Sequence, residues 1–300
     1  MVHDVVIIGG GPGGLAAALT LGRARRSALL FDSGPRRNAK AEQVHNFLTR
    51  DGTPPEELRR IGREQLRIYP SIEVKDARVE SIAGERGAFR ITTSAGEHEA
   101  RRVLLCTGMI DELPAIEGFA ELWGESIFQC PYCHGWEVRD QRWGLFAPAG
   151  NDSMLPFALK LRGWTDRVVV FTETADDATR AAFHNAGIQL ETTPVARLVG
   201  REQRLESVEL ADGRRVPCEV LFAHPPQRQV PLVRSLDLAL EHGFVRIDES
   251  GQTSVPGIYA AGDLTSHLQA AIAAASAGMR TAAAINLDLA MERARTPTTC

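Results

Sequence analysis

Residues 4–21 have the sequence DVVIIGGGPGGLAAALTL, which contains the motif that decides the fold. Residues 4–8 form a strand-length, largely apolar run, as expected of a strand that is buried on both faces of a parallel sheet. A glycine-rich turn follows, and residues 15–21 favour a helix. This order of strand, turn and helix predicts the opening of a Rossmann-like dinucleotide-binding domain.

The turn contains the pattern GxGxxG, formed by Gly9, Gly11 and Gly14. The first glycine makes a tight turn, the second lets a pyrophosphate approach the backbone, and the third lets helix and strand pack closely. We expect the helix N-terminus, with Pro12 in the turn beside it, to face a diphosphate. A glycine-rich loop without a ligand is the alternative. A second strand ends in Asp32, whose carboxylate suits ribose hydroxyls, and this favours the dinucleotide site.

Two further runs end in small or acidic residues that suit a cofactor. Residues 103–108 (VLLCTG) form a buried strand that leads into a small-residue turn, and residues 253–263 (TSVPGIYAAGD) deliver a carboxylate suited to ribityl hydroxyls. The alanine-rich helix over residues 269–285 permits close packing on a flat ring, although a buried core helix would have the same composition. Together with Asn46, which lies earlier in the chain, these segments supply the other expected cofactor contacts, which are Thr107, Gly108, Gly262, Asp263, Gln269 and Ala270.

A CxxC pair stands in the middle of the chain, within residues 130–135 (CPYCHG). Cys130 and Cys133 can close a small disulfide and exchange electrons with other thiols. His134 could carry the proton that exchange requires, or it could be an exposed or capping histidine. Half of a zinc site is another alternative, but zinc needs a second pair, and the remaining cysteines are scattered singly. We therefore expect no metal. Those cysteines are Cys106 and Cys218, expected to be structural, and Cys300, a weak candidate for a third exchange thiol.

A second nucleotide-binding fold follows the cysteine pair, but its binding residues differ from those of an intact site. Residues 142–147 predict a strand and residues 154–161 a helix, yet the turn between them, residues 148–153, contains one glycine. The next strand, residues 168–171, is followed by three carboxylates, where an NADPH site would need arginines for the 2'-phosphate. NADPH binding is therefore not expected. The carboxylates are Glu173, Asp176 and Asp177.

Composition sets limits on the protein class. The chain has 300 residues, of which 44% are hydrophobic and 24% charged, and it carries a net charge of -4. This length suits two domains, and the acidic balance argues against nucleic-acid binding. No apolar run is long enough to span a bilayer, and the N-terminus lacks the features of a signal peptide. A low count of five cysteines suits a reducing cytoplasm.

The order of GGGPGG, CTG, CxxC and TSVPGIYAAGD resembles that of the low-molecular-weight thioredoxin reductase family. The resemblance implies an α/β fold of two Rossmann-like, three-layer ββα domains, the second inserted into the first. It implies a discontinuous FAD domain over residues 1–113 and 241–300, and an inserted pyridine-nucleotide-type domain over residues 114–240. It also implies FAD as cofactor and a homodimer.

Two departures from that family narrow the expected function. His134 replaces the acid that usually follows the second cysteine, and the NADPH glycines and basic motif are missing. In these respects CPYCHGWE is most similar to the FAD-dependent dithiol oxidases that form the gliotoxin, holomycin and romidepsin disulfides. It is also similar to divergent thioredoxin reductases without NADPH binding. By resemblance, Cys133 is the flavin-proximal thiol and Cys130 the outer one.

The resulting hypothesis is oxidation of a dithiol to a disulfide, with molecular oxygen as the terminal acceptor. The thiol substrate is a small-molecule dithiol or a thioredoxin-like protein. The alternatives are a thioredoxin reductase-like enzyme reduced by ferredoxin or by an atypical nicotinamide site, and a non-catalytic redox sensor.

Overall fold

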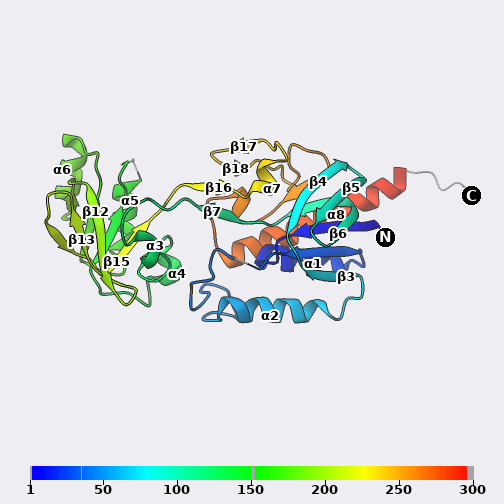
Figure 1. Cartoon of the computed structure of the whole chain (residues 1–300), viewed down its shortest axis with the longest axis horizontal. Coiled ribbons are helices and arrows are strands. Elements are labelled where there is room, and N and C mark those ends of the chain that lie inside the picture. Colours follow the sequence, from blue (N-terminus) through cyan, green and yellow to red (C-terminus); the bar gives the residue numbers. More distant parts are fainter. Residues whose placement is uncertain (1, 35, 150–152, 296–300) are drawn as a thin grey trace, which may run out of the picture. The chain divides into compact units, whose positions relative to one another are not determined.

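The computed structural model describes residues 2–34, 36–149 and 153–295, and the chain divides into two compact units (Figure 1). The first unit comprises Met1–Ile110 and Gln227–Cys300, and the second comprises Asp111–Pro226. The chain returns to the first unit at residue 227, earlier than the expected residue 241. The reason is that Val233 and Leu238 pack into the hydrophobic core of the first unit.

The first unit contains one seven-stranded sheet, whose main path has the order β3-β2-β1-β6-β5-β4, with β19 paired to β6. The strands of this sheet are β1 (Val2–Ile8), β2 (Ala28–Asp32), β3 (Ile72–Asp76), β4 (Val79–Glu85), β5 (Ala88–Thr93), β6 (Gly96–Leu105) and β19 (Ile258–Ala260). The helices are α1 (Pro12–Arg23), α2 (Pro55–Leu66), α7 (Pro231–Arg234), the 3-10 helix η1 (Asp263–Thr265) and α8 (Ala271–Arg295). The short strands are β7 (Met109–Asp111), which pairs with β16 (Gln227–Gln229), and β17 (Leu240–Glu241), which pairs with β18 (Phe244–Val245).

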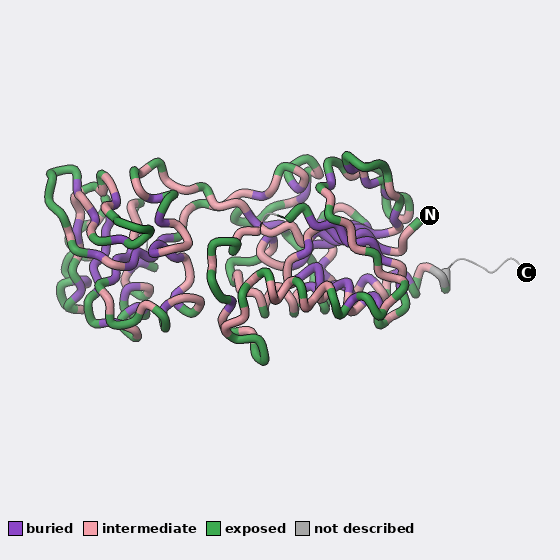
Figure 2. Tube along the Cα trace, turned by 60° about the horizontal axis from the view of Figure 1, so that its bottom comes forward, coloured by how far each residue is buried: buried purple, intermediate pink, exposed green. Residues whose placement is uncertain are grey.

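Alternation of side chains along β1 explains the three layers of this unit. Val5 and Ile7 pack against α1 and α8, whereas Val6 and Ile8 pack against the antiparallel strands β4 and β5. Because successive side chains of a strand point to opposite faces, a strand apolar at every position must be covered on both sides. Figure 2 shows the resulting concentration of buried residues in the strands of this unit.

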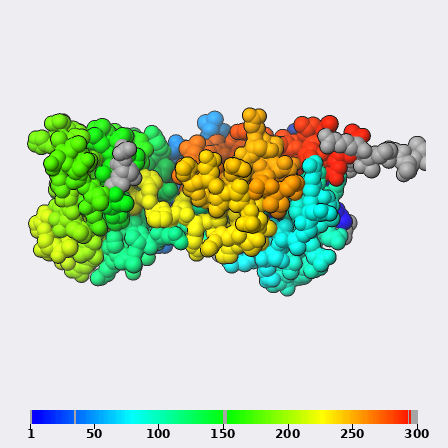
Figure 3. All heavy atoms as spheres, turned by 90° about the horizontal axis from the view of Figure 1, so that it is seen from above, coloured from blue at the N-terminus to red at the C-terminus, as the bar shows by residue number. Residues whose placement is uncertain are grey.

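Strand β6 joins the parallel and antiparallel parts of the sheet. Its first half pairs antiparallel with β5, for example at Ile91↔His98, and its second half pairs parallel with β1 and β19. The segment that returns from the second unit lies beside the β4–β5 hairpin, as the yellow and cyan atoms of Figure 3 show. Phe244 and Val245 of this segment share a hydrophobic core with Phe89 of β5.

The second unit repeats the architecture around a five-stranded parallel sheet of order β11-β10-β9-β15-β8. Val168 and Val170 face α5 and α6, whereas Val169 and Phe171 face the antiparallel strands β12 and β13. The predicted fold class, with two Rossmann-like ββα domains, is confirmed. The parallel strands are β8 (Ile127–Phe128), β9 (Trp143–Phe146), β10 (Val168–Phe171), β11 (Gln189–Glu191) and β15 (Val220–Ala223). The other elements are α3 (Phe119–Leu122), α4 (Pro131–His134), α5 (Met154–Leu161), α6 (Asp177–Asn185), β12 (Val195–Arg201), β13 (Arg204–Leu210) and β14 (Arg215–Pro217).

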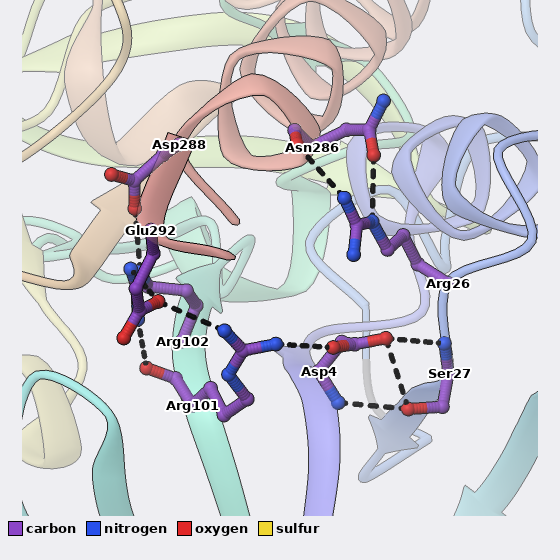
Figure 4. Close-up of polar contacts among 8 residues, drawn as sticks. All are labelled: Asp4, Arg26, Ser27, Arg101, Arg102, Asn286, Asp288 and Glu292. Atoms are coloured by element: carbon purple, nitrogen blue, oxygen red, sulfur yellow. Dashed lines mark hydrogen bonds and ion pairs between the residues drawn. The ribbon is translucent and has the colours of Figure 1, made fainter. Parts of the chain in front are cut away.

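A polar network fastens the C-terminal half of α8 to the sheet (Figure 4). Arg102 of β6 is fully buried and donates to Asp288 at 2.6 Å and to Glu292 at 2.8 Å. Arg101 bridges Glu292 at 3.0 Å and Asp4 at 2.9 Å. Because these contacts join segments distant in the sequence, they define where α8 lies on the sheet and therefore where its N-terminal end is held.

We expect Arg102→Met to lower the free energy of unfolding by about 3 kcal/mol, because breaking a buried ion pair leaves carboxylates without their partner. Urea unfolding of the protein, followed by circular dichroism, measures the change. Arg90→Met on the neighbouring strand β5 is the matched control. Arg90 is exposed and lies 3.9 Å from Glu97, so its loss should change stability by about 0.5 kcal/mol or less. Equal losses of stability in the two variants would contradict the conclusion that the buried Arg102 network fastens α8 to the sheet.

Candidate functional site

The C-terminal ends of four parallel strands meet at one edge of the first unit's sheet. The register pairs Ile8 of β1 with Phe31 of β2 and Leu105 of β6, and pairs Leu105 with Ala260 of β19. Ligands of open α/β sheets bind at this edge. The predicted residues that end these four strands or follow them within three positions are thus placed at one edge. They are Gly9, Asp32, Thr107, Gly108, Gly262 and Asp263.

The three motif glycines occupy different environments in the β1–α1 turn. A Cβ at Gly9 would lie 2.1 Å from the Cys106 carbonyl oxygen, and one at Gly14 would lie 1.9 Å from the Gly9 oxygen. A Cβ at Gly11 would meet nothing within 4 Å. Gly11 is the N-cap of α1, whose first residue is Pro12, and no side chain caps this helix end. The turn therefore leaves open space beside Gly11 at the N-terminal end of a twelve-residue helix, which suits a diphosphate.

Asp32 is buried at the end of β2 and is held by two donors. The Gly34 N–H donates to Oδ1 at 2.9 Å, and Arg59 Nε of α2 donates to Oδ2 at 2.7 Å. Burial by itself would raise the pKa of Asp32, but these two hydrogen bonds outweigh it and hold the pKa below its usual value. A carboxylate has further lone pairs that can accept from ribose hydroxyls. Sequence reasoning missed Arg59, because no local pattern links a helix arginine to Asp32.

The turn after β6 places Thr107 beside the same edge. Its Oγ1 is buried and has no hydrogen-bond partner within residues 2–34, 36–149 and 153–295. Gly108 has a φ of 68° and open space where a Cβ would point. Buried polar atoms are normally hydrogen-bonded, so an orphaned hydroxyl here suits a bound ligand. Cys106 is a free cysteine packed against the core, and burial raises the pKa of its thiol to about 12, as suits the predicted structural role.

Asp263 and Gln269 are brought together by residues from distant segments. Arg37 Nη1 donates to Gln269 Oε1 at 2.5 Å and lies 3.6 Å from Asp263 Oδ2. Gln269 and Gln227 exchange amide hydrogen bonds of 3.0 and 2.8 Å. Ala270 accepts from the backbone N–H of Ala274 in the first turn of α8. Arg37 and Gln227 were not predicted as site residues, although the adjacent Arg36-Arg37 pair was visible in the sequence.

Asn46 lies in the long loop after β2 with a positive φ of 59°. Its N–H donates to Asp51 Oδ1 at 2.7 Å, and the neighbouring His45 has Nδ1 3.4 Å from Asp51 Oδ2. Asp51 therefore holds this part of the loop in a defined conformation.

The open space at Gly11 and the orphaned Thr107 hydroxyl together fit a dinucleotide cofactor at the strand edge, with Asp32 and Asp263 as acceptors for sugar hydroxyls.

The cysteine pair opens a single helical turn in the second unit. Cys130 is the N-cap of α4, Pro131 is its first residue, and the Cys133 N–H donates to the Cys130 carbonyl at 3.1 Å. The two cysteines form a disulfide with Cα atoms 5.3 Å apart. Both are partly exposed, so the sulfurs lie near solvent. Because α4 has 4 residues, a helix dipole acting on either cysteine sulfur would have little helix behind it.

His134 is stacked on an aromatic ring instead of being exposed. Its ring lies 4.2 Å from that of Phe128 at an interplanar angle of 10°, and both ring nitrogens are buried. The alternative of a solvent-exposed histidine is therefore wrong for this structure. The stacking holds the imidazole one residue after Cys133, where it remains a candidate for proton transfer to a thiolate.

The equivalent strand edge of the second unit differs from the dinucleotide edge of the first. The Ala147 N–H donates to the Phe171 carbonyl at 2.9 Å, as the Gly9 N–H does to Phe31 at 2.8 Å, so Ala147 stands in the position of the first glycine. Thr174 Oγ1 donates to the Ala149 carbonyl at 2.6 Å, which ties the turn after β9 to the turn after β10. Residues 150–152 of the predicted turn lie outside the described residues.

One of the carboxylates after β10, Asp176, has a structural role that sequence reasoning did not identify. Asp176 is the N-cap of α6 and accepts from the Thr179 N–H at 2.7 Å, and hydrogen bonds from the side chain and the backbone of Thr179 lower the pKa of Asp176. Cys218 is fully buried and donates to the Val220 carbonyl at 3.2 Å, as suits the predicted structural thiol. Cys300 lies outside the described residues.

Helix length and side-chain clustering in the described part of the chain bear on membrane spanning and metal binding. No helix there has the length and apolar character needed to cross a membrane. Within the same residues, no group of three or more histidine, cysteine or acidic side chains could hold a metal ion.

Comparison with known proteins places this chain among disulfide oxidoreductases. Residues 3–147 and 164–278 match the family described as pyridine nucleotide-disulphide oxidoreductase. The chain is 33% identical to thioredoxin reductase tcpT of Claviceps purpurea, covering 87% of this chain and 86% of that relative. It is 31% identical to thioredoxin reductase sirT of Leptosphaeria maculans, covering 96% and 94%. It is also similar to the crystal structure of an oxidoreductase from Agrobacterium tumefaciens, with 35% identity, a TM-score of 0.90, and coverage of 97% and 99%.

Proposed function

Because the chain belongs to the pyridine nucleotide-disulphide oxidoreductase family and is a thioredoxin reductase-like flavoprotein, we propose that it oxidises a dithiol to a disulfide. Electrons enter at the Cys130–Cys133 disulfide and leave through FAD to molecular oxygen. The overall reaction converts one dithiol and one oxygen molecule into one disulfide and one hydrogen peroxide. The substrate is a small-molecule dithiol or a thioredoxin-like protein, and we expect the enzyme to be a homodimer.

The direction of electron flow is supported by the strand edge of the second unit. A pyridine nucleotide would need backbone approach at the turn after β9, but Ala147 stands in the place of the first glycine and Thr174 binds the Ala149 carbonyl. No arginine follows β10 directly; Glu173, Asp176 and Asp177 do, and their charges oppose a 2'-phosphate. A reduced nicotinamide is therefore a poor electron source, and thiols are the source that the Cys130–Cys133 pair can use.

Two thiol–disulfide exchange steps account for the reaction at the cysteine pair. A substrate thiolate attacks Cys130 Sγ, the bond between the two cysteine sulfurs breaks, and Cys133 leaves as a thiolate. The second substrate thiolate attacks the substrate sulfur of this mixed disulfide and releases Cys130 as a thiolate. The substrate loses two electrons and two protons, and the cysteine pair gains the two electrons. His134 would hold or deliver a proton beside Cys133.

FAD, when bound, supplies the two-electron acceptor that returns the cysteine pair to the disulfide. Gly9, Gly11 and Gly14 would cradle its pyrophosphate with Pro12 at the start of α1, and Asp32 would bind the ribose of its adenosine half. Asp263 would bind the ribityl chain. The remaining contacts would be made by Asn46, Thr107, Gly108, Gly262, Gln269 and Ala270.

An oxygen electrode tests the proposal with a panel of dithiols. We expect dithiol-dependent oxygen uptake with stoichiometric hydrogen peroxide and no nicotinamide requirement. We also expect NADPH or NADH to leave the flavin oxidised under anaerobic conditions. Bleaching by a reduced nicotinamide within one turnover time would favour a thioredoxin reductase-like enzyme, the activity named for the fungal relatives. Flavin that responds to ferredoxin alone would favour a ferredoxin-fed reductase, and no turnover with any donor would favour a redox sensor.

A further inference from the structure

Two exposed aromatic residues lie close to the redox cysteines in the sequence, and each of their rings lies beside a cation. Tyr132 is 61% exposed and Trp136 is 67% exposed. Lys160 Nζ lies 5.6 Å from the centre of the Tyr132 ring, and Arg139 Cζ lies 4.2 Å from the centre of the Trp136 ring. Tyr132 stands between the two cysteines in the sequence, and Trp136 follows Cys133 by three positions. These four residues are called the cation–aromatic rim: Tyr132, Trp136, Arg139 and Lys160.

One ring of the rim, that of Tyr132, rests on an aromatic base that reaches into the core. Tyr132 packs edge-on against Trp164 at 5.5 Å, and Trp164 stacks on the fully buried Trp143 at 6.1 Å. A Cβ at Gly135 would lie 3.1 Å from Trp164 and 3.2 Å from Trp143, so the turn after α4 sits directly on these rings. Exposed aromatic side chains on a rigid base are typical of a surface that binds a ligand.

The two cations of the rim have no carboxylate partner within the described residues. Lys160 contacts the Tyr132 and Phe157 rings, the latter at 4.0 Å, and burial lowers the pKa of its ammonium group. Arg139 donates to the Trp136 carbonyl at 2.5 Å. Glu137 is the acidic residue that lies between Trp136 and Arg139 in the sequence. Many other arginines of this chain pair with acids, as Arg102, Arg197 and Arg214 do. Two cations without such partners, partly desolvated by aromatic rings, favour an anionic ligand.

We propose that the cation–aromatic rim recognises a dithiol that carries a negative charge, such as a carboxylate, on an apolar body. The inference rests on the proposed function, since it names the substrate class of the same disulfide. The thiols would reach Cys130 while the apolar body lies on Tyr132 or Trp136 and the anion meets Lys160.

Dihydrolipoate and dihydrolipoamide test this inference, because they have the same dithiol and differ in the charge of the carboxyl group. We measure the second-order rate of flavin bleaching under anaerobic conditions, which does not depend on the terminal acceptor. A partly exposed ion pair contributes up to about 1 kcal/mol, which corresponds to an about fivefold preference for dihydrolipoate. We expect Lys160→Gln to lower the dihydrolipoate rate towards that of dihydrolipoamide. We expect 0.5 M salt, about ten times the assay concentration, to do the same.

The matched control is Arg162→Gln, which removes the same charge two residues further along. Arg162 donates to the Ala186 carbonyl at 2.8 Å, and the preference should stay at its wild-type value. Equal rates for the two dithiols in the wild-type enzyme overturn the inference, and so does a preference that survives Lys160→Gln.

Binding of the oxidised ligands separates this inference from the proposed function. Tryptophan fluorescence of the oxidised holoenzyme follows the binding of lipoate and lipoamide without turnover. About fivefold tighter binding of lipoate than of lipoamide, lost in Lys160→Gln, supports the proposed role of the rim. If no dithiol bleaches the flavin, the dithiol-oxidase proposal is wrong, but this binding preference would still support the rim. Equal affinities for lipoate and lipoamide overturn the proposed role of the rim in recognising an anion.

Discussion

We expect Cys130→Ser to lower dithiol-dependent turnover by about a thousandfold or more, while the protein keeps its bound FAD. Serine cannot form the disulfide that accepts substrate electrons, and its hydroxyl is a poor nucleophile and leaving group beside a thiolate. FAD should stay because the expected cofactor residues lie in the first unit, whereas Cys130 lies in the second. Oxygen uptake and the visible flavin spectrum of the same sample measure both properties.

Cys218→Ser is the matched control for this experiment, since it makes the same change in the same unit. Cys218 is fully buried, burial raises the pKa of its thiol to about 12, and a serine hydroxyl can donate to the Val220 carbonyl in its place. Turnover of this variant should stay within about twofold of wild type, because the thiol takes no part in exchange. Loss of FAD from Cys130→Ser would show that the cysteine pair is structural.

We expect Gly11→Val to lower the affinity of the apoprotein for FAD by about a hundredfold or more, with little effect on its fold. A Cβ at Gly11 meets nothing within 4 Å, so the valine side chain enters the open space where a pyrophosphate would lie. The N-cap backbone is extended there, with φ of -77°, which valine adopts readily. Apoprotein stability should fall by about 1 kcal/mol or less. Flavin fluorescence quenching and thermal unfolding measure affinity and stability.

Gly14→Val provides the contrast that makes the Gly11 result interpretable. Its Cβ would lie 1.9 Å from the Gly9 carbonyl oxygen, so the backbone must move and both stability and FAD affinity should fall. If Gly11→Val binds FAD with wild-type affinity, the pyrophosphate does not lie at this turn. If Gly11→Val unfolds as readily as Gly14→Val, the space beside Gly11 is not open.

The parts of the site that sequence predicted are those with local patterns. GxGxxG places Gly9, Gly11 and Gly14 in a strand–turn–helix segment that a few consecutive residues indicate, although the Cys106 carbonyl beside Gly9 comes from a distant segment. The CxxC spacing likewise brings two sulfurs together within one helical turn. His134 shows the limit of this reasoning, because its stacking on Phe128 depends on where strand β8 enters the sheet. No spacing between these two residues indicates a ring stack.

By itself, the sequence determined the two Rossmann-like folds and the order of their motifs, because alternating apolar side chains and glycine turns act over a few residues. Tertiary structure alone decided which distant groups meet. Arg37 and Gln269 lie 232 positions apart, yet they are joined by a hydrogen bond of 2.5 Å. Lys160 reaches Tyr132 because α5 and α4 cover the same aromatic base. Such contacts follow from how strands and helices pack, and the free energy that selects them comes from the whole core.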